Sequence, residues 1–234
     1  DDTFVVANGD VMSDLDVATL VDAHRPFGAR ETLHLIGVDD PSAFGVLDLA
    51  DNGHVRAFVE KPAPGTEPSN LINAGTYVFE PDVLDLIAPG ERVSVERDTF
   101  PLLVAAGGVY GLATDDYWID AGRPDLYRAA NLDLLDGLRR NEHADPVAAS
   151  AAVAADATIR NSIVGDHVVV APGATVVDSV LLPHASVGGS AVVERSLVMG
   201  RIGVGSHVSD SMIGAAGAVA DGEVVRDTSI PPTP

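Results

Sequence analysis

Residues 161–181 read NSIVGDHVVVAPGATVVDSVL, and the pattern of this stretch continues toward the end of the chain. A polar residue followed by serine or threonine recurs with spacings of 17, 17, 15 and 17 residues. Between these pairs, small aliphatic residues recur about every six positions. The pairs are Asn161-Ser162, Asp178-Ser179, Arg195-Ser196, Asp210-Ser211 and Asp227-Thr228, and the aliphatic residues include Val164, Val170, Val176, Val187 and Val193.

Three six-residue sides make one triangular coil of about 18 residues, with one inward aliphatic side chain per side. Glycines stand where such a coil would turn its corners, at positions 165, 173, 188, 205 and 217. No aromatic residue follows Tyr127, as expected for a prism too narrow to hold a ring. The second half of the chain is therefore predicted to be a parallel β-helix of hexapeptide repeats, which spans residues 153–234.

The first half alternates strand and helix signals, which predicts an α/β layered domain over residues 1–140. A segment of small and polar residues at 141–152 is the expected linker. Helices are predicted at 81–87, 96–106 and 123–140, and one after Ser13, which with Asp16 resembles a capping box. Strands are predicted at 3–7, 32–38, 44–49, 55–60, 71–79 and 109–113.

Composition excludes several functions. The 234 residues include 14 basic and 35 acidic ones, so a net charge of −21 makes binding to nucleic acid unfavourable. No apolar run is long enough to span a bilayer, and no basic segment of a signal peptide opens the chain. The absence of cysteine favours a reducing compartment, so we expect a cytoplasmic protein.

Two aspartates follow strand-like runs. Asp10 ends the sequence Asn8-Gly9-Asp10, and Asp120 lies in a motif with the only tryptophan. Ligands of open α/β sheets bind at the carboxyl ends of strands. We therefore expect the two carboxylates to share one Mg²⁺ and to lie within about 10 Å of each other. The alternatives are an ordinary turn at Asp10 and a helix cap at Asp120.

Glu60 and Lys61 are the second candidate pair. Lys61 is the only lysine among 13 arginines, which indicates a position that needs an ammonium group rather than any positive charge. Glu60 could accept hydrogen bonds from sugar hydroxyls and Lys61 could hold a phosphate. The alternative is a solvated pair before a loop.

The third candidate is Asn73-Ala74-Gly75, inside an apolar strand. Glycine within a strand often marks the close approach of a ligand, and a β-bulge is the alternative. The charged residues of 94–101 favour the start of a helix that packs on the sheet, and the alternative is that these charges orient neighbouring groups.

Taken in order, these motifs resemble those of the sugar-1-phosphate nucleotidyltransferases, and most of all the mannose-1-phosphate guanylyltransferase group. The resemblance implies a partial Rossmann-like (GT-A-like) domain followed by a left-handed β-helix. It implies transfer of a nucleotidyl group from an NTP, most often GTP, to a sugar-1-phosphate such as mannose-1-phosphate. The motifs are Asn-Gly-Asp at 8–10, Glu-Lys-Pro at 60–62, Asn-Ala-Gly-Thr-Tyr-Val-Phe at 73–79, Ser-Val-Glu-Arg-Asp-Thr-Phe-Pro at 94–101 and Tyr-Trp-Ile-Asp-Ala-Gly at 117–122.

The resemblance also implies residue roles. Asp10 and Asp120 would bind Mg²⁺, Lys61 would hold the sugar phosphate, and Asp10, Lys61 and Asp120 would be the catalytic residues. The substrate-binding residues would be Gly9, Glu60, Lys61, Asn73 and Gly75. Homo-oligomers would form through the β-helix.

The family opens with a strand and a Gly-rich loop that grips the nucleotide, and this sequence contains neither. We therefore expect the chain to be a segment of a longer protein. We also expect the opening strand, 3–7, to have one uncovered edge here and to be internal in the complete domain, because it is apolar on both faces.

Two other functions remain open. One is a hexapeptide acyltransferase with a histidine base, for which His167, His184 and His207 are candidates. His167 and His184 are 17 residues apart and should stack on successive coils, whereas His207 has a different phase. The other is a non-catalytic regulatory or scaffold subunit.

Overall fold

The computed structural model describes residues 2–140 and 145–231, which form two compact units, Asp1–Trp118 and Ile119–Pro234. The first unit is built on a mixed sheet, with the order β5-β4-β6-β3-β7. Its strands are β1 (Phe4–Ala7), β2 (Val11–Ser13), β3 (Glu31–Gly37), β4 (Gly45–Leu49), β5 (Val55–Glu60), β6 (Leu71–Phe79) and β7 (Val109–Thr114), and the boundary between the units falls within β8 (Trp118–Asp120). β3 and β7 pair in parallel and the other pairs with known register are antiparallel, while β2 pairs with β8 in a separate ribbon.

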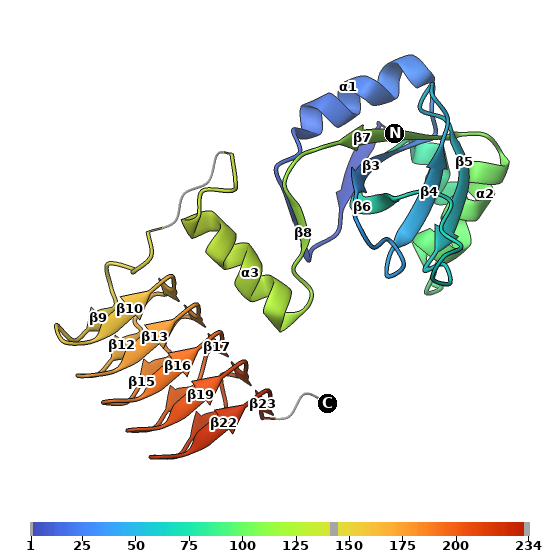
Figure 1. Cartoon of the computed structure of the whole chain (residues 1–234). Helices are drawn as coiled ribbons and strands as arrows, with labels where there is room; N and C mark the ends of the chain where they lie inside the picture. The colour runs from blue at the N-terminus through green and yellow to red at the C-terminus, as the bar shows by residue number, and fades with distance from the viewer. Residues whose placement is uncertain (1, 141–144, 232–234) are drawn as a thin grey trace. The chain divides into compact units, whose positions relative to one another are not determined.

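Helices cover this sheet, as Figure 1 shows. α1 packs on β3, β6 and β7, and α2 packs on β5. The first unit has two clusters of buried apolar side chains, and the larger one includes Leu33, Leu35, Tyr77, Phe79 and Phe100. The helical segments are α1 (Val17–Phe27), the 3₁₀ helix η1 (Pro81–Leu86), the π-helical turn η2 (Val95–Thr99) and α2 (Phe100–Ala105).

β1 is an edge strand. It pairs with the second half of β6, from Phe4 opposite Phe79 to Ala7 opposite Thr76. Among the described residues no strand pairs with its other edge, and 42% of Val5 is exposed. The uncovered edge expected from the sequence is therefore present, and its burial in a complete domain stays a prediction.

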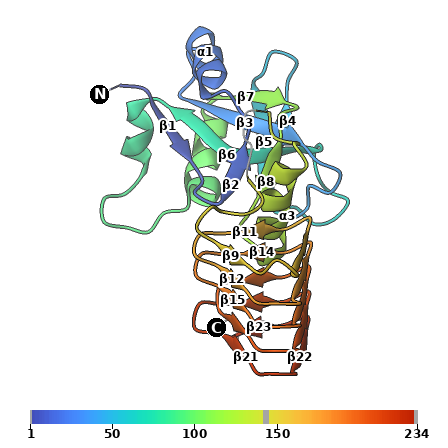
Figure 2. The ribbon, with the colours of Figure 1, turned by 90° about the vertical axis from the view of Figure 1, so that its left-hand side faces the viewer.

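The helix of the second unit is α3 (Pro124–Leu135), and the unit continues as a parallel β-helix of three five-stranded sheets. Figure 2 shows the coils stacked one upon another. The sheets are β9-β12-β15-β18-β21, β10-β13-β16-β19-β22 and β11-β14-β17-β20-β23. Their strands are β9 (Ala152–Val153), β10 (Thr158–Arg160), β11 (Ile163–Val164), β12 (Val169–Val170), β13 (Thr175–Val177), β14 (Val180–Leu181), β15 (Ser186–Val187), β16 (Val192–Glu194), β17 (Leu197–Val198), β18 (Arg201–Ile202), β19 (His207–Ser209), β20 (Met212–Ile213), β21 (Ala218–Val219), β22 (Val224–Arg226) and β23 (Ser229–Ile230).

The predicted inward residues form the core of the β-helix. Val164, Val170, Val176, Val187 and Val193 are all at most 2% exposed. The strand register repeats the sequence spacing, because Thr158, Thr175, Val192, His207 and Val224 lie opposite one another on successive coils. The fold class predicted from the repeat is confirmed.

The single 15-residue interval has a structural cause. The corner between β17 and β18 is two residues shorter than the corresponding corner between β14 and β15. It contains Gly200, where a Cβ atom would overlap the carbonyl oxygens of Gly214 and Gly217 on the next coil. A glycine is therefore required where the coil is shortened.

The repeated serines form a buried ladder at one corner. The hydroxyl of each serine accepts a hydrogen bond from the backbone N–H of the equivalent residue on the next coil, at 3.0 to 3.2 Å. Each hydroxyl also donates to the carbonyl two residues before it. The members are Ser162, Ser179, Ser196 and Ser211, and Thr228 donates the last N–H.

Removing one hydroxyl from this ladder should destabilise the β-helix. In Ser196→Ala the buried N–H of Ser211 loses its acceptor, so we expect the free energy of unfolding to fall by about 1–3 kcal/mol. Ser186→Ala, on an outward position of β15 with no side-chain hydrogen bond among the described residues, is the matched control. Equal losses for the two variants in denaturant titrations would contradict this role of the ladder.

Two helix predictions need correction. The helix predicted at 123–140 ends at Leu135, because Gly137 adopts a left-handed φ of 70°, and Leu138 is 59% exposed instead of lying on a packed stripe. The first helix is capped by Asp16, whose carboxylate accepts from the N–H of Ala18, and not by Ser13.

The predicted linker, 141–152, lies partly outside the described residues. Val147 bridges to Val164 and Ala148 donates to the carbonyl of Val164, so the described part of this segment already belongs to the stacked coils. No described helix has the length and apolar content that a bilayer-spanning helix needs.

Candidate active site

The Asn73-Ala74-Gly75 motif forms an irregularity in β6. Leu33 of β3 pairs with Tyr77 and Leu35 pairs with Asn73, so three residues of β6 face one residue of β3. Gly75 has a φ of 76°, which favours glycine. The bulge that the sequence left as an alternative is therefore present, and it takes residues 74–76 out of the regular ladder between β6 and β3.

The end of β1 is held against this bulge. The backbone N–H of Asn8 donates to the carbonyl of Gly75 at 2.8 Å. A Cβ atom on Gly75 would lie 2.9 Å from the side-chain nitrogen of Asn8, so only glycine allows the Asn8 amide to lie there. The first and third sequence motifs, more than 60 residues apart, thus come into direct contact.

Asn73 is fixed at both ends of its amide. Its Oδ1 accepts from the N–H of Gly75 at 3.0 Å, and its Nδ2 donates to the Tyr77 hydroxyl at 2.9 Å. The indole N–H of Trp118 donates to the carbonyl of Ala74 at 2.9 Å, which holds the other side of the bulge. Asn73 is half-buried, so its remaining amide proton can reach a ligand.

Glu60 and Lys61 lie at the end of β5. Glu60 is opposite Gly45 of β4, where a Cβ atom would lie 3.0 Å from its Oε2. Lys61 has a left-handed φ of 48° and donates its N–H to the carbonyl of Phe44 at 2.9 Å. Left-handed backbone is uncommon for a residue with a side chain and is frequent at functional sites.

Glu96 and Arg97 join this group, although the sequence pattern favoured a packing role for them. Burial raises the pKa of the Glu60 carboxyl, the negative charge of Glu96 raises it further, and Lys61 and Arg97 oppose the shift. Burial also raises the pKa of the Tyr77 hydroxyl, and the charge of Glu96 adds to that shift. Glu96 is thus close enough to act on both Glu60 and Tyr77.

The sequence pattern marked the charged segment that contains these two residues, but it did not show that they would lie beside Glu60. Ser94 is the N-cap of η2, because its hydroxyl accepts from the N–H of Arg97, and a π-helical turn follows. Such turns are frequent at functional sites, but they have no reliable sequence signature.

The predicted metal ligands are placed on separate units. Asp10 is exposed in the turn between β1 and β2, and Gly9 beside it has open space around its Cα. Asp120 ends β8, and its Oδ1 accepts from the N–H of Gly122 at 2.9 Å. The N-cap of α3 is Arg123, so Asp120 does not cap that helix. Within residues 2–140 and 145–231, no three or more acidic or histidine side chains form a metal-binding group.

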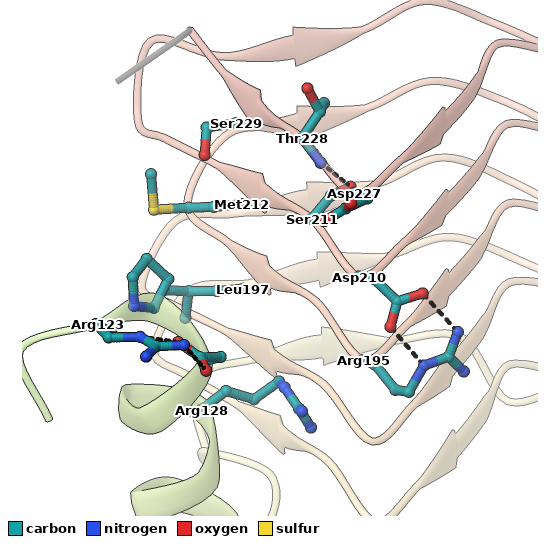
Figure 3. Close-up of a pocket in the computed structure, with 12 residues that line it drawn as sticks. Arg123, Arg128, Arg195, Leu197, Asp210, Ser211, Met212, Asp227, Thr228 and Ser229 are labelled. Atoms are coloured by element: carbon teal, nitrogen blue, oxygen red, sulfur yellow. Dashed lines mark hydrogen bonds and ion pairs between the residues drawn. The ribbon is translucent and has the colours of Figure 1, made fainter. Parts of the chain in front are cut away.

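The second unit contains a cavity of about 460 Å³ beside the start of α3 (Figure 3). Two of its three arginines are neutralised, because Arg123 pairs with Asp125 and Arg195 pairs with Asp210 at 2.7 to 3.1 Å. The third, Arg128, donates to the carbonyl of Asp178 at 3.0 Å. With three aspartates among its lining residues, the cavity offers little net charge to an anion.

The histidines of the β-helix are arranged as their spacing predicts. The rings of His167 and His184 stack at 5.2 Å on successive coils, and His207 lies apart from them, 3.1 Å from a carboxylate oxygen of Glu194.

Comparison with known proteins covers both halves of the chain. The nucleotidyl transferase family model matches residues 1–137, and the model described as GlmU-like, C-terminal hexapeptide matches residues 134–209. A mannose-1-phosphate guanylyltransferase of Mycobacterium tuberculosis is 45% identical over 139 residues, which are 58% of this chain and 38% of that protein. A UTP–glucose-1-phosphate uridylyltransferase of Synechocystis is 42% identical over 133 residues, which are 55% of this chain and 34% of that protein.

A mannose-1-phosphate guanyltransferase of Kluyveromyces lactis is 36% identical over 143 residues, which are 60% of this chain and 39% of that protein. The chain thus spans between about a third and two fifths of the length of these relatives. Since the first family model matches more than half of the chain and covers the contacts among Asn8, Asn73, Gly75 and Tyr77, the chain belongs to the nucleotidyl transferase family.

Proposed function

We propose that the full-length protein transfers a nucleotidyl group from an NTP, with GTP preferred, to a sugar-1-phosphate, with mannose-1-phosphate preferred. The observation that supports this most is the gathering of Asn8, Asn73, Glu60 and Lys61, from three segments of the first unit, around Tyr77 and Glu96. The guanylyltransferase relatives support the choice of substrates.

The reaction needs positioning more than acid–base chemistry. A non-bridging oxygen of the sugar phosphate attacks the α-phosphorus of the NTP, and the bond from that phosphorus to the bridging α–β oxygen breaks, so that pyrophosphate leaves with the electron pair. The attacking phosphate is already ionised at neutral pH, so no general base is needed. In this proposal Lys61 holds the sugar phosphate, while Glu60, Asn73 and the backbone around Gly75 contact the sugar hydroxyls and Gly9 lies near the nucleotide phosphates.

Asp10 and Asp120 are the proposed Mg²⁺ ligands. Mg²⁺ prefers oxygen ligands and usually takes one or two carboxylates together with substrate phosphates, so this donor set fits the ion. Bound there, Mg²⁺ would offset negative charge on the phosphates.

The test of the function is pyrophosphate release by the full-length protein, with GTP or UTP as donor and mannose-1-phosphate or glucose-1-phosphate as acceptor. We expect release to require Mg²⁺ and to be fastest with GTP and mannose-1-phosphate. Faster turnover of UTP with glucose-1-phosphate would change the proposed substrates but would leave the proposed reaction class unchanged. No release with any pair would favour the regulatory or scaffold alternative.

Replacing either aspartate with asparagine should affect folding little, because the side chains have nearly the same volume. It should weaken the binding of Mg²⁺ strongly, because a negative charge is lost. We expect Asp10→Asn and Asp120→Asn each to raise the Mg²⁺ concentration for half-maximal activity about tenfold or more. Asp22→Asn, an exposed change on α1, is the control. An unchanged Mg²⁺ titration for either variant removes that residue from the proposed metal site.

We also propose that the protein is cytoplasmic and forms homo-oligomers through its β-helix. Solvent-facing apolar side chains on the coils support the second proposal, since Val169, Val204 and Val224 are at least half exposed. Analytical ultracentrifugation of the chain measures the assembly state directly.

A further inference from the structure

Tyr77 lies beneath the bulge and is 3% exposed. Its hydroxyl accepts the hydrogen bond from Asn73 Nδ2 at 2.9 Å, and the side chain of Asn8 lies close enough to lower the pKa of that hydroxyl slightly against the effect of burial. The sequence motifs assigned no role to this residue. Yet one buried oxygen bonds to the amide of Asn73 in β6 and lies near the side chain of Asn8 at the end of β1.

The ring of Tyr77 is fixed by the core. It stacks on Phe79, with centroids 5.7 Å apart and an angle of 20° between the planes, and it meets Phe100 edge-on at 5.3 Å. Because these rings belong to the central apolar cluster, the hydroxyl has little freedom to move.

The amide of Asn73 is oriented by its partners. The N–H of Gly75 donates to Oδ1, so the NH₂ group must face Tyr77, where it donates one of its two protons. The second proton and one lone pair of Oδ1 remain for a ligand. Without the hydroxyl, only the Gly75 contact would restrain the amide.

We propose that Tyr77 is a positioning residue of the sugar-phosphate site, whose hydroxyl fixes the side chains of Asn8 and Asn73 on either side of Gly75 without contacting the substrate. This inference rests on the proposed function. Positioning of sugar contacts acts equally on bound substrate and transition state, so its loss should raise KM for the sugar phosphate and leave kcat almost unchanged.

The test is Tyr77→Phe in the full-length protein, since this change keeps the ring and removes only the hydroxyl. We expect the dissociation constant for mannose-1-phosphate, measured by calorimetry, and its KM to rise about tenfold, while KM for the NTP and kcat stay within about twofold. Tyr110→Phe is the matched control, because Tyr110 lies on the same sheet, stacks on Phe27 at 4.4 Å and shows no hydroxyl hydrogen bond among the described residues.

A double-mutant cycle separates positioning from general stability. In an Asn73→Ala background, Tyr77→Phe should raise KM for mannose-1-phosphate by less than about twofold, because the amide that the Tyr77 hydroxyl orients is gone. Full additivity, or an unchanged KM for the sugar phosphate in Tyr77→Phe, overturns the inference and leaves the proposed function intact. Absence of sugar-phosphate binding and turnover in the unmodified protein overturns both. Should Tyr77→Phe not fold, Asn8→Ala is expected to weaken mannose-1-phosphate binding by a similar factor, and unchanged binding overturns the inference.

Discussion

Lys61→Arg in the full-length protein is expected to lower kcat/KM for the sugar-1-phosphate by about 100-fold, although it keeps the positive charge. An ammonium group is a compact charge with three rotatable donors, whereas a guanidinium is a wide planar fork that cannot occupy the same space. Stabilisation of a developing phosphate charge depends on donor placement, and loss of one donor commonly costs a factor of 100 to 1,000. Lys61→Ala should lower kcat/KM for the sugar-1-phosphate by at least the same factor.

The surroundings of Lys61 make this variant a sharp test. The residue is exposed and its backbone is held by the hydrogen bond to Phe44, so a change at the end of the side chain should leave the fold intact. Arg56→Lys, the reverse exchange at an exposed position of β5 that pairs with Asp48, is the control and should retain full activity. Unchanged sugar-phosphate kinetics in Lys61→Arg would assign Lys61 to the solvated surface.

The unfolding free energy of the first unit is expected to fall steeply between pH 5 and pH 8 because of Glu31. This residue is fully buried, and neither of its carboxylate oxygens has a hydrogen-bond partner among the described residues. Its neighbours across the sheet are Phe79 and Val109, both in the apolar core. Burial raises the pKa of the Glu31 carboxyl from 4.5 to about 9.

The direction of the effect follows from linkage. The folded state holds a proton on Glu31 that the unfolded state releases above about pH 4.5, so its full contribution to stability exists below that pH. The contribution then declines at about 1.4 kcal/mol per pH unit and is lost as the pH rises through about 9. Between pH 5 and pH 8 this amounts to about 4 kcal/mol.

Glu31→Gln removes this titration, so the difference in unfolding free energy between the variant and the unmodified chain should change by about 4 kcal/mol over the same pH range. Trp118 is a suitable probe, because it is the only tryptophan and its indole is bonded to β6. Glu91→Gln, at an exposed position, is the control. A pH-independent difference for Glu31→Gln would show that the carboxylate reaches a partner or solvent.

Local pattern was enough to predict the β-helix. Each coil contacts only its neighbours, so inward aliphatic residues every six positions, corner glycines and the absence of rings specify the stack without knowledge of any distant segment. The buried Val170 and Val187 and the ladder from Ser162 to Ser211 follow this rule. Most strands of the first unit were predictable for a similar reason, because their β-branched and apolar runs end at turn residues.

The sequence by itself therefore determined the repeat fold, the strands of the sheet and the candidate residues Asp10, Glu60, Lys61, Asn73 and Asp120. Only the tertiary structure decided which of them meet. The contact of Asn8 with Gly75 depends on pairing between β1 and β6 and on a bulge three residues long, while the nearness of Glu96 to Glu60 accompanies the packing of α2 on β5. Register and packing between distant segments depend on the combined burial of many side chains along the chain. A short motif therefore cannot predict them. Glu31 shows this most directly, because it lies one residue before the strand predicted at 32–38, and neither its place in β3 nor its complete burial without a partner among the described residues was predicted.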